Sequence, residues 1–203
     1  MHRFFLGFSR LMAIAGGFVL SILVAIVVLS IIGRELNAFL HGDFAQGAFK
    51  GLADWMLGVQ VPGIWGPIKL GPFNGDYEIV EAGIAFSIFA FLPLAQITGA
   101  HATVDVFTSL LPDRPNRVLR AISELAFAIV LIIIAVQLWQ GTVSKFERHQ
   151  TTFLLQFPVW WAYAASLVGA IAAAIVSVYV ALMRLIESVI GHRVMPAGEG
   201  ADH

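Results

Sequence analysis

The chain has no cysteine and few charged residues. Lys, Arg, Asp and Glu make up 12% of its 203 residues and the net charge is −1, whereas soluble domains average about 25% charged residues. Without cysteine, disulfide frameworks, thiolate metal sites and thiol redox chemistry are excluded. The near-zero net charge excludes a broad basic surface, so no nucleic acid partner is expected. What remains is strongly apolar, 59% hydrophobic residues with a mean hydropathy of +0.84, which indicates one integral membrane domain, residues 1–203.

Four long apolar runs dominate the chain. They cover about residues 11–32, 79–98, 119–138 and 161–183, and about 20 apolar residues in a helix cross a hydrocarbon core of roughly 30 Å. The first run exceeds the core of a signal peptide and ends at Arg34 and Glu35, so we expect a retained span. The pattern predicts an all-α integral membrane protein with four transmembrane helices and a short tail, residues 186–203.

The connection between the first two spans, residues 35–75, is the longest of the chain. Apolar and polar residues alternate at helical spacing from Asp43 to Val59, which predicts an amphipathic helix in the membrane interface or against a partner. The Pro- and Gly-rich residues 61–75 predict a turn-rich loop rather than a helix. A second short apolar face over residues 104–111 predicts another interfacial helix.

The basic residues favour one orientation in the membrane. Four spans put both termini on the same side, and basic residues concentrate on the cytoplasmic side of membrane proteins. The terminal side is therefore predicted to be cytoplasmic. It carries Arg3, Arg10, Arg114, Arg117, Arg120, Arg184 and Arg193, against Arg34, Lys50, Lys69, Lys145 and Arg148 on the other side.

Small residues recur every fourth position in two of the spans. Such stripes let helix backbones approach closely in lipid, and we interpret them as faces that pack on a partner helix. Because Gly and Ala are common in spans anyway, the first stripe is equally open to a reading without function. The two stripes are Ala13, Gly17, Ser21 and Ala25, and Ala165, Gly169, Ala173 and Ser177, the second extending to Ala181.

Three polar pairs lie near the ends of the spans and are interpreted as structural ties. Paired carboxylates do acid–base chemistry or bind cations only when buried together, and a helix amino end favours carboxylates through its dipole. The His pair is two ligands short of a metal site. The pairs are Glu78 with Glu81, His101 with Asp105, and Arg120 with Glu124.

The sequence lacks the usual signatures of catalysis. No histidine lies within a span, so haem ligation in the membrane is not supported, and no phosphate-binding glycine loop, zinc-protease helix or nucleophile elbow is present. No charged residue falls near the centre of a span, where transporters place substrate and ion sites. We therefore predict no catalytic residue, cofactor or metal, and a scaffold or accessory subunit bound to another membrane protein.

Three segments resemble one known family. The run GDYEIVE before the second span, PLAQITGAHATVDVFTSLLP after it, and FPVWWAYAASLVGAI at the start of the fourth span are similar to the small, DctQ-like membrane subunit of tripartite ATP-independent periplasmic (TRAP) transporters. The similarity extends over roughly residues 10–185. The connection over residues 35–75 is longer than expected for the family.

The resemblance implies a function that the residue patterns alone do not give. It implies a bacterial inner-membrane subunit that scaffolds a large permease, which takes up an organic acid with sodium and moves its substrate domain like an elevator. A periplasmic binding protein delivers the substrate, and membrane lipid is the other partner. His101 and Asp105 would fix a cytoplasmic surface helix. The alternative is an anchor subunit of a respiratory or other membrane enzyme complex that uses Glu78, Glu81, His101 and Asp105.

Overall fold

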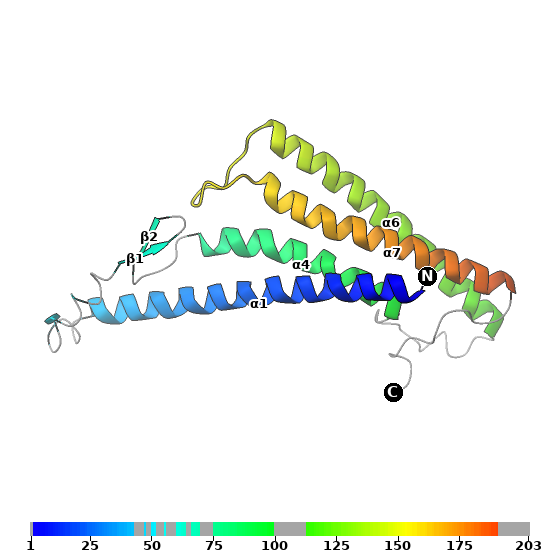
Figure 1. Cartoon of the computed structure of the whole chain (residues 1–203), viewed down its shortest axis with the longest axis horizontal. Coiled ribbons are helices and arrows are strands. Elements are labelled where there is room, and N and C mark those ends of the chain that lie inside the picture. Colours follow the sequence, from blue (N-terminus) through cyan, green and yellow to red (C-terminus); the bar gives the residue numbers. More distant parts are fainter. Residues whose placement is uncertain are drawn as a thin grey trace.

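Four long helices form the protein (Figure 1). The computed structural model describes residues 2–42, 47, 50, 51, 55, 60–63, 66–69, 75–99 and 113–190. Each of its four helices is long and apolar enough to cross a membrane. This confirms the predicted all-α class with four spans. The helices are α1 (His2–His41), α4 (Asp76–Thr98), α6 (Asp113–Glu147) and α7 (Trp160–Ile190).

The helices run on beyond the predicted spans. The apolar run of residues 11–32, for example, lies inside a helix of 40 residues. Polar and basic residues at the ends of the helices face water or lipid headgroups and continue the helical backbone, because no proline or glycine pair stops it there. The helix bounds are thus set by the flanking chain, whereas the apolar runs mark only the part that fits the hydrocarbon.

The helices pack as two pairs that meet along α4 and α7. The α1–α4 pair and the α6–α7 pair come together where α1 begins and α7 ends, which we call the near end, and spread apart toward the far end (Figure 1). The far end carries the start of α4 and the loop that joins α6 to α7. The start of α1 and the end of α7 lie at the same end of the bundle, as an even number of spans requires.

Glycines and a seven-residue repeat set the contact between α1 and α4. The buried residues Ser9, Gly16, Leu23 and Ser30 recur every seventh position of α1, which is the spacing of helices that pack nearly parallel. A methyl group built on Gly16 would come within 2.9 Å of Ala90 Cβ, and one built on Gly83 within 2.8 Å of the Leu23 side chain. The two helices therefore approach as closely as their backbones allow.

A short hairpin lies in the first connection. Strands β1 (Gln60–Gly63) and β2 (Gly66–Lys69) pair antiparallel, with Val61 opposite Ile68. The prediction of a loop over residues 61–75 missed this pairing, because Pro62 and Pro67 argue against strands, yet two short edge strands tolerate them. In the predicted amphipathic helix, the described residues 47, 50, 51 and 55 are helical. The predicted surface helix over residues 104–111, with His101 and Asp105, lies outside the described residues.

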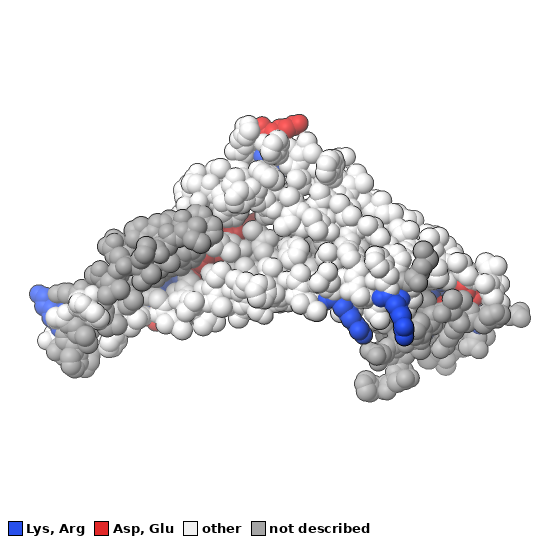
Figure 2. Space-filling view, in the orientation of Figure 1, with Lys and Arg blue, Asp and Glu red and all other residues white. Residues whose placement is uncertain are grey.

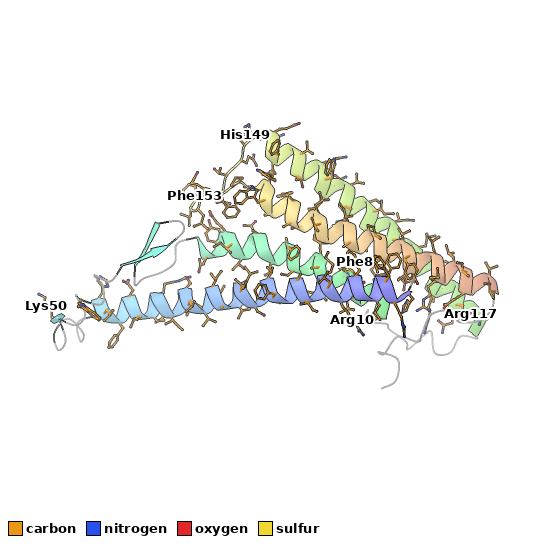
Figure 3. All side chains as sticks on the ribbon, viewed as in Figure 1. Phe8, Arg10, Lys50, Arg117, His149 and Phe153 are labelled. Carbon is orange, nitrogen blue, oxygen red and sulfur yellow. The ribbon has the colours of Figure 1, made fainter. Side chains whose placement is uncertain are left out.

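Charged side chains keep to the two ends of the bundle. On the face seen in Figure 2, Lys, Arg, Asp and Glu gather at the extremities, and an uncharged zone lies between them. Figure 3 shows the same zone filled by hydrocarbon side chains. In the sequence the uncharged stretches are residues 11–33, 82–99, 125–144 and 161–183.

Candidate functional site

A hollow opens where α4 and α7 separate. At Gly169 the two helices touch, because a methyl group there would come within 2.8 Å of Phe89 Cβ and 3.2 Å of the Ala90 backbone nitrogen. From that contact toward the far end the helices diverge (Figure 1), and the side chains of the described residues do not fill the space between them completely. A cavity of about 460 Å³ results, which is within the size range of small-molecule sites.

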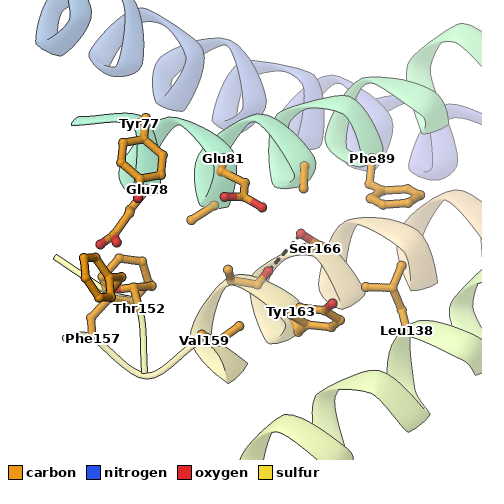
Figure 4. Close-up of a pocket in the computed structure, with 14 residues that line it drawn as sticks. Tyr77, Glu78, Glu81, Phe89, Leu138, Thr152, Phe157, Val159, Tyr163 and Ser166 are labelled. Carbon is orange, nitrogen blue, oxygen red and sulfur yellow. Dashed lines mark hydrogen bonds between the residues drawn. The ribbon is translucent and has the colours of Figure 1, made fainter. Parts of the chain in front are cut away.

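The cavity has two carboxylates at its outer end and an apolar floor (Figure 4). Helix α4 contributes the carboxylates and Phe89, α6 contributes Leu138, and α7 contributes Tyr163 and Ser166. The Ser166 hydroxyl donates to the Ala162 carbonyl at 2.8 Å, as serines in membrane helices commonly do. The remaining lining residues are Tyr77, Ala82, Ala85, Thr152, Phe153, Phe157, Val159 and Ala162.

Glu78 holds the loop between α6 and α7 in place. Its two carboxylate oxygens accept hydrogen bonds from the backbone N–H groups of Leu154 (2.7 Å) and Leu155 (2.9 Å). The side chain is buried, with 5% of the residue exposed. A buried carboxylate needs such donors, because an unpaired charge away from water is costly. The predicted structural role of Glu78 thus has a specific geometry in the structure, although Glu78 pairs with a loop and not with Glu81.

The loop that Glu78 holds is itself ordered by backbone bonds. Thr152 N–H donates to the Phe157 carbonyl at 3.0 Å, and Val159 N–H donates to the Gln150 carbonyl at 2.9 Å. Gln156 adopts a left-handed conformation with φ 56°, which turns the chain between these bonds. Leu155 fills the space beside Gly75, whose φ of 103° permits the sharp start of α4. The sequence did not signal this clamp, because its donors are backbone groups.

Glu81 lies one helical turn further along α4 and points into the cavity (Figure 4). Glu78 and Glu81 were predicted as two carboxylates on one helical face, and both line the cavity. Their surroundings differ. Glu78 accepts hydrogen bonds from two backbone N–H groups, whereas Glu81 is exposed to the cavity. This arrangement does not provide a pair that shares a proton.

A second polar cluster joins the helices at the near end. Gln96 of α4, only 2% exposed, donates through Nε2 to the Glu124 carboxylate of α6. On α7, Arg184 Nη1 lies 2.9 Å from Glu187 Oε2, and both side chains are largely buried. The requirement of Gln96 for a partner is readable from its position late in an apolar span, but the identity of that partner is not.

The predicted pairing of Arg120 with Glu124 is not the contact that forms. The structure describes both residues and gives them separate partners, since Arg120 Nε donates to Asn116 Oδ1 at 3.3 Å and Glu124 accepts from Gln96. The reason is that Glu124 turns toward α4, where a buried amide needs an acceptor. Arg120 stays on the exposed face of α6.

At the far end, α1 and α4 are joined by an ion pair. Arg34 Nη2 lies 2.8 Å from Asp76 Oδ2 and also donates to Ser30 Oγ at 3.3 Å. Ser30 is buried, while the Arg34 side chain is 55% exposed. This contact sets the level along α1 at which α4 begins.

The small-residue stripe of α7 is used mostly within the chain. Gly169, Ala173 and Ser177 are buried, and Ala173 packs in a cluster with Leu131 of α6. Ala165, by contrast, is exposed. The packing that the structure gives Gly169 and Ala173 is thus against helices of the same chain, and contact of this stripe with a partner helix stays a prediction that applies to Ala165.

The small-residue stripe of α1 lies beside the face that packs on α4. Ser21 and Ala25 are exposed, and Ala13 and Gly17 are half-buried. The residues that face α4 instead repeat every seventh position, a signal that was present in the sequence as Ser9, Gly16 and Ser30. A partner helix on the exposed stripe stays a prediction.

The described residues contain no metal-binding constellation. Among them no group of three or more His, Asp or Glu side chains is arranged to hold a metal ion. The site is a hollow with carboxylates and an apolar floor on a bundle of four helices that are long and apolar enough to cross a membrane, which defines a multi-pass membrane protein.

Comparison with known families names the class more closely. Residues 69–188, more than half of the chain, match the family described as tripartite ATP-independent periplasmic transporters, DctQ component. The chain belongs to this family and is a small membrane subunit of a TRAP transporter, not an enzyme. It works with a large permease and a substrate-binding protein. No curated protein and no solved structure is similar enough to count as a match.

The matched segment covers three of the four long helices. It begins at Lys69 and includes α4, α6 and nearly all of α7. The cavity, the Glu78 carboxylate with its loop donors, and the pair of Gln96 with Glu124 all lie within it. Helix α1 lies outside it. The family match therefore covers the contacts that join α4, α6 and α7, and does not cover those of α1.

Proposed function

We propose that the chain is the fixed scaffold subunit of a sodium-coupled TRAP system that takes up an organic acid. The observation that carries the proposal is the uncharged middle of all four helices. A sodium ion or a carboxylate substrate that crosses the membrane needs polar or charged ligands at mid-depth. These ligands would be supplied by the large permease, and the small subunit would hold it in place.

The bundle also has the construction of a rigid support. Close glycine contacts join α1 to α4 and α4 to α7, and hydrogen bonds or ion pairs tie the helices at both ends. Close backbone contacts and hydrogen bonds between helices favour one arrangement of the bundle. We infer that the permease moves its substrate domain against this bundle while the bundle keeps its shape.

The location of the subunit follows from the same proposal. The excess of arginine at the near end supports a cytoplasmic position for both termini in a bacterial inner membrane. The far end, with the cavity and the loop that Glu78 holds, would face the periplasm, where the binding protein arrives. The anchor-subunit alternative is disfavoured by the family assignment.

Reconstitution tests the division of labour. The chain alone, the large permease alone and both together are placed in lipid vesicles with the binding protein and a panel of labelled organic acids. We expect sodium-dependent accumulation only with both membrane subunits present. Sodium-driven accumulation by the isolated chain would show that its own helices carry solute, and the scaffold proposal would be wrong.

A cross-link tests whether the scaffold stays fixed. Because the sequence has no cysteine, thiols placed at Ser30 and Asp76, which both contact Arg34, can be joined by a short bifunctional reagent without background. A fixed scaffold should keep most of its transport when α1 and α4 are locked together. Loss of transport on cross-linking, restored by a cleavable reagent, would contradict the proposal.

A further inference from the structure

The cavity between α4, α6 and α7 contains a carboxylate that this chain leaves without a partner. Within the described residues Glu81 takes part in no hydrogen bond or ion pair, although Glu78, three residues earlier, accepts two. Glu81 lies one turn inside an apolar span and lines the hollow. A carboxylate that is exposed to such a hollow can accept hydrogen bonds from a cationic group that enters it.

A basic group lies beside one residue that lines the hollow. Lys145 Nζ stands over the ring of Tyr163, a lining residue, at 5.8 Å from the ring centre, and donates to Gln150 Oε1 at 2.8 Å. Lys145 and Glu81 are both described and are not paired with each other. The hollow thus has one negative charge in its lining, Glu81, and one positive charge next to its lining residue Tyr163, which suits a zwitterion better than a simple cation.

The inner part of the hollow is hydrocarbon. Ala85 and Phe89 of α4 and Leu138 of α6 line it below the charged rim. A second groove of about 460 Å³ lies at the same end of the bundle and is lined almost wholly by apolar side chains of α1, α4 and α7. The two hollows share three lining residues, Ala82, Phe157 and Ala162.

The depth of the hollow matches the headgroup level of a bilayer. Trp139, Trp160 and Trp161 lie at the far ends of α6 and α7, and tryptophans mark the interface between hydrocarbon and headgroups. A molecule with two opposite charges at this level and hydrocarbon below it is a phospholipid. A basic side chain from a partner protein would satisfy Glu81 but would leave Lys145 and both apolar surfaces unused.

We propose that this cavity is a binding site for one aminophospholipid, a phosphatidylethanolamine. Its ammonium group donates hydrogen bonds to Glu81, its phosphate lies against Lys145, and an acyl chain follows Phe89 and Leu138. The lipid fills the space between α4 and α7 and so sets the angle between the two helix pairs. The proposal rests on the geometry of this chain alone and does not require the transport function.

Lipid competition measured by native mass spectrometry tests the site. The purified full chain is stripped of lipid and offered equal amounts of phosphatidylethanolamine, phosphatidylcholine and phosphatidylglycerol. Phosphatidylcholine keeps the charge but has no N–H donor, and phosphatidylglycerol lacks the cation. We expect phosphatidylethanolamine to be retained about tenfold better than either, which is the effect of one charge-assisted hydrogen bond.

Matched variants assign the preference to the cavity. Glu81→Gln should abolish the preference for phosphatidylethanolamine, and Lys145→Gln should lower its retention. Glu147→Gln, which removes an exposed carboxylate from the same end of α6, should leave it unchanged. Ala85→Phe provides a second probe that blocks the apolar part of the cavity without changing a charge, and it should also expel the lipid.

Several results would overturn the proposal. Equal retention of the three lipids would do so, as would an unchanged preference in both Glu81→Gln and Ala85→Phe. A third such result is a Glu81→Gln chain that still prefers phosphatidylethanolamine but no longer co-purifies with the large permease. That outcome would assign the cavity to a basic side chain of the partner protein instead of a lipid.

Discussion

Gly169 of α7 lies directly against Phe89 of α4, and the two helices can approach this closely only because glycine has no side chain. A methyl group on Gly169 would come within 2.8 Å of Phe89 Cβ. In lipid, helices associate through such van der Waals packing, because the hydrophobic effect gives no preference for a protein neighbour over an acyl chain. This one contact is where the two helix pairs are joined before they spread apart.

Gly169→Leu should therefore disrupt the chain itself. Overpacking a close helix contact costs about 1–3 kcal/mol or more, and here the Phe89 and Ala90 backbone cannot move away without shifting α4. We expect a lower Tm in detergent and reduced yield of the folded chain even without a partner.

Ala165→Leu is the matched control for that substitution. Ala165 is exposed, one turn earlier on the same helix, so the isolated chain should keep its Tm. If Ala165→Leu nevertheless reduces co-purification with the large permease, the exposed part of the stripe is a partner face. If Gly169→Leu leaves the isolated chain as stable as the parent, the contact with α4 is not structural.

Glu78→Gln should loosen the loop between α6 and α7. The amide keeps one acceptor oxygen but presents an NH₂ group to the other backbone N–H, so one of the hydrogen bonds from Leu154 and Leu155 is lost. We expect a Tm lower by several degrees and faster cleavage within residues 149–159 by a protease added to the purified chain. Glu147→Gln, at an exposed site near the same loop, should change neither; equal cleavage of both variants would contradict the clamp.

Gln96→Leu should weaken the join between α4 and α6. The substitution removes the donor to Glu124 and leaves that half-buried carboxylate with fewer partners, which costs about 1 kcal/mol in a membrane bundle. A thermal melt should show a Tm lower by a few degrees. Gln137→Leu makes the same chemical change on the exposed side of α6 and should leave the Tm unchanged or raise it, since the new side chain faces lipid.

Gly75→Ala should destabilise the start of α4 for two separable reasons. The φ of 103° is unfavourable for an L-residue, and a methyl group there would come within 2.6 Å of Leu155 Cγ. Backbone strain of this kind costs about 1–3 kcal/mol. Adding Leu155→Ala should restore only the part due to the clash. Full recovery of the parent Tm in the double variant would show that the backbone conformation carries no cost.

The sequence predicted the parts of the fold that depend on burial in lipid. Apolar runs located all four helices, because the bilayer demands about 20 uncharged residues wherever a chain crosses it. The helix ends were less accurate. Residues 33–41 continue α1 with polar and apolar side chains mixed, and no local stop signal distinguishes that continuation from a loop.

The contacts between helices were harder to predict, because several stripes compete on each helix. In α1 the four-residue stripe through Gly17 was the more visible one, whereas the seven-residue stripe through Gly16 faces α4. In the polar pairs, a partner on another helix replaced the local one, as when Glu124 bonded Gln96 instead of Arg120. The spacing of residues along one helix shows which side chains share a face, but it does not show which residues of a neighbouring helix they will contact.

The ion pair of Arg34 with Asp76 fixes how high α1 stands above its neighbour. Helix α4 begins level with Arg34, and α1 continues to His41, so at 1.5 Å per residue its last two turns rise about 10 Å further. The last two turns of α1 therefore project beyond the start of α4. A partner protein that docks on the start of α4 must therefore also accommodate these two turns of α1.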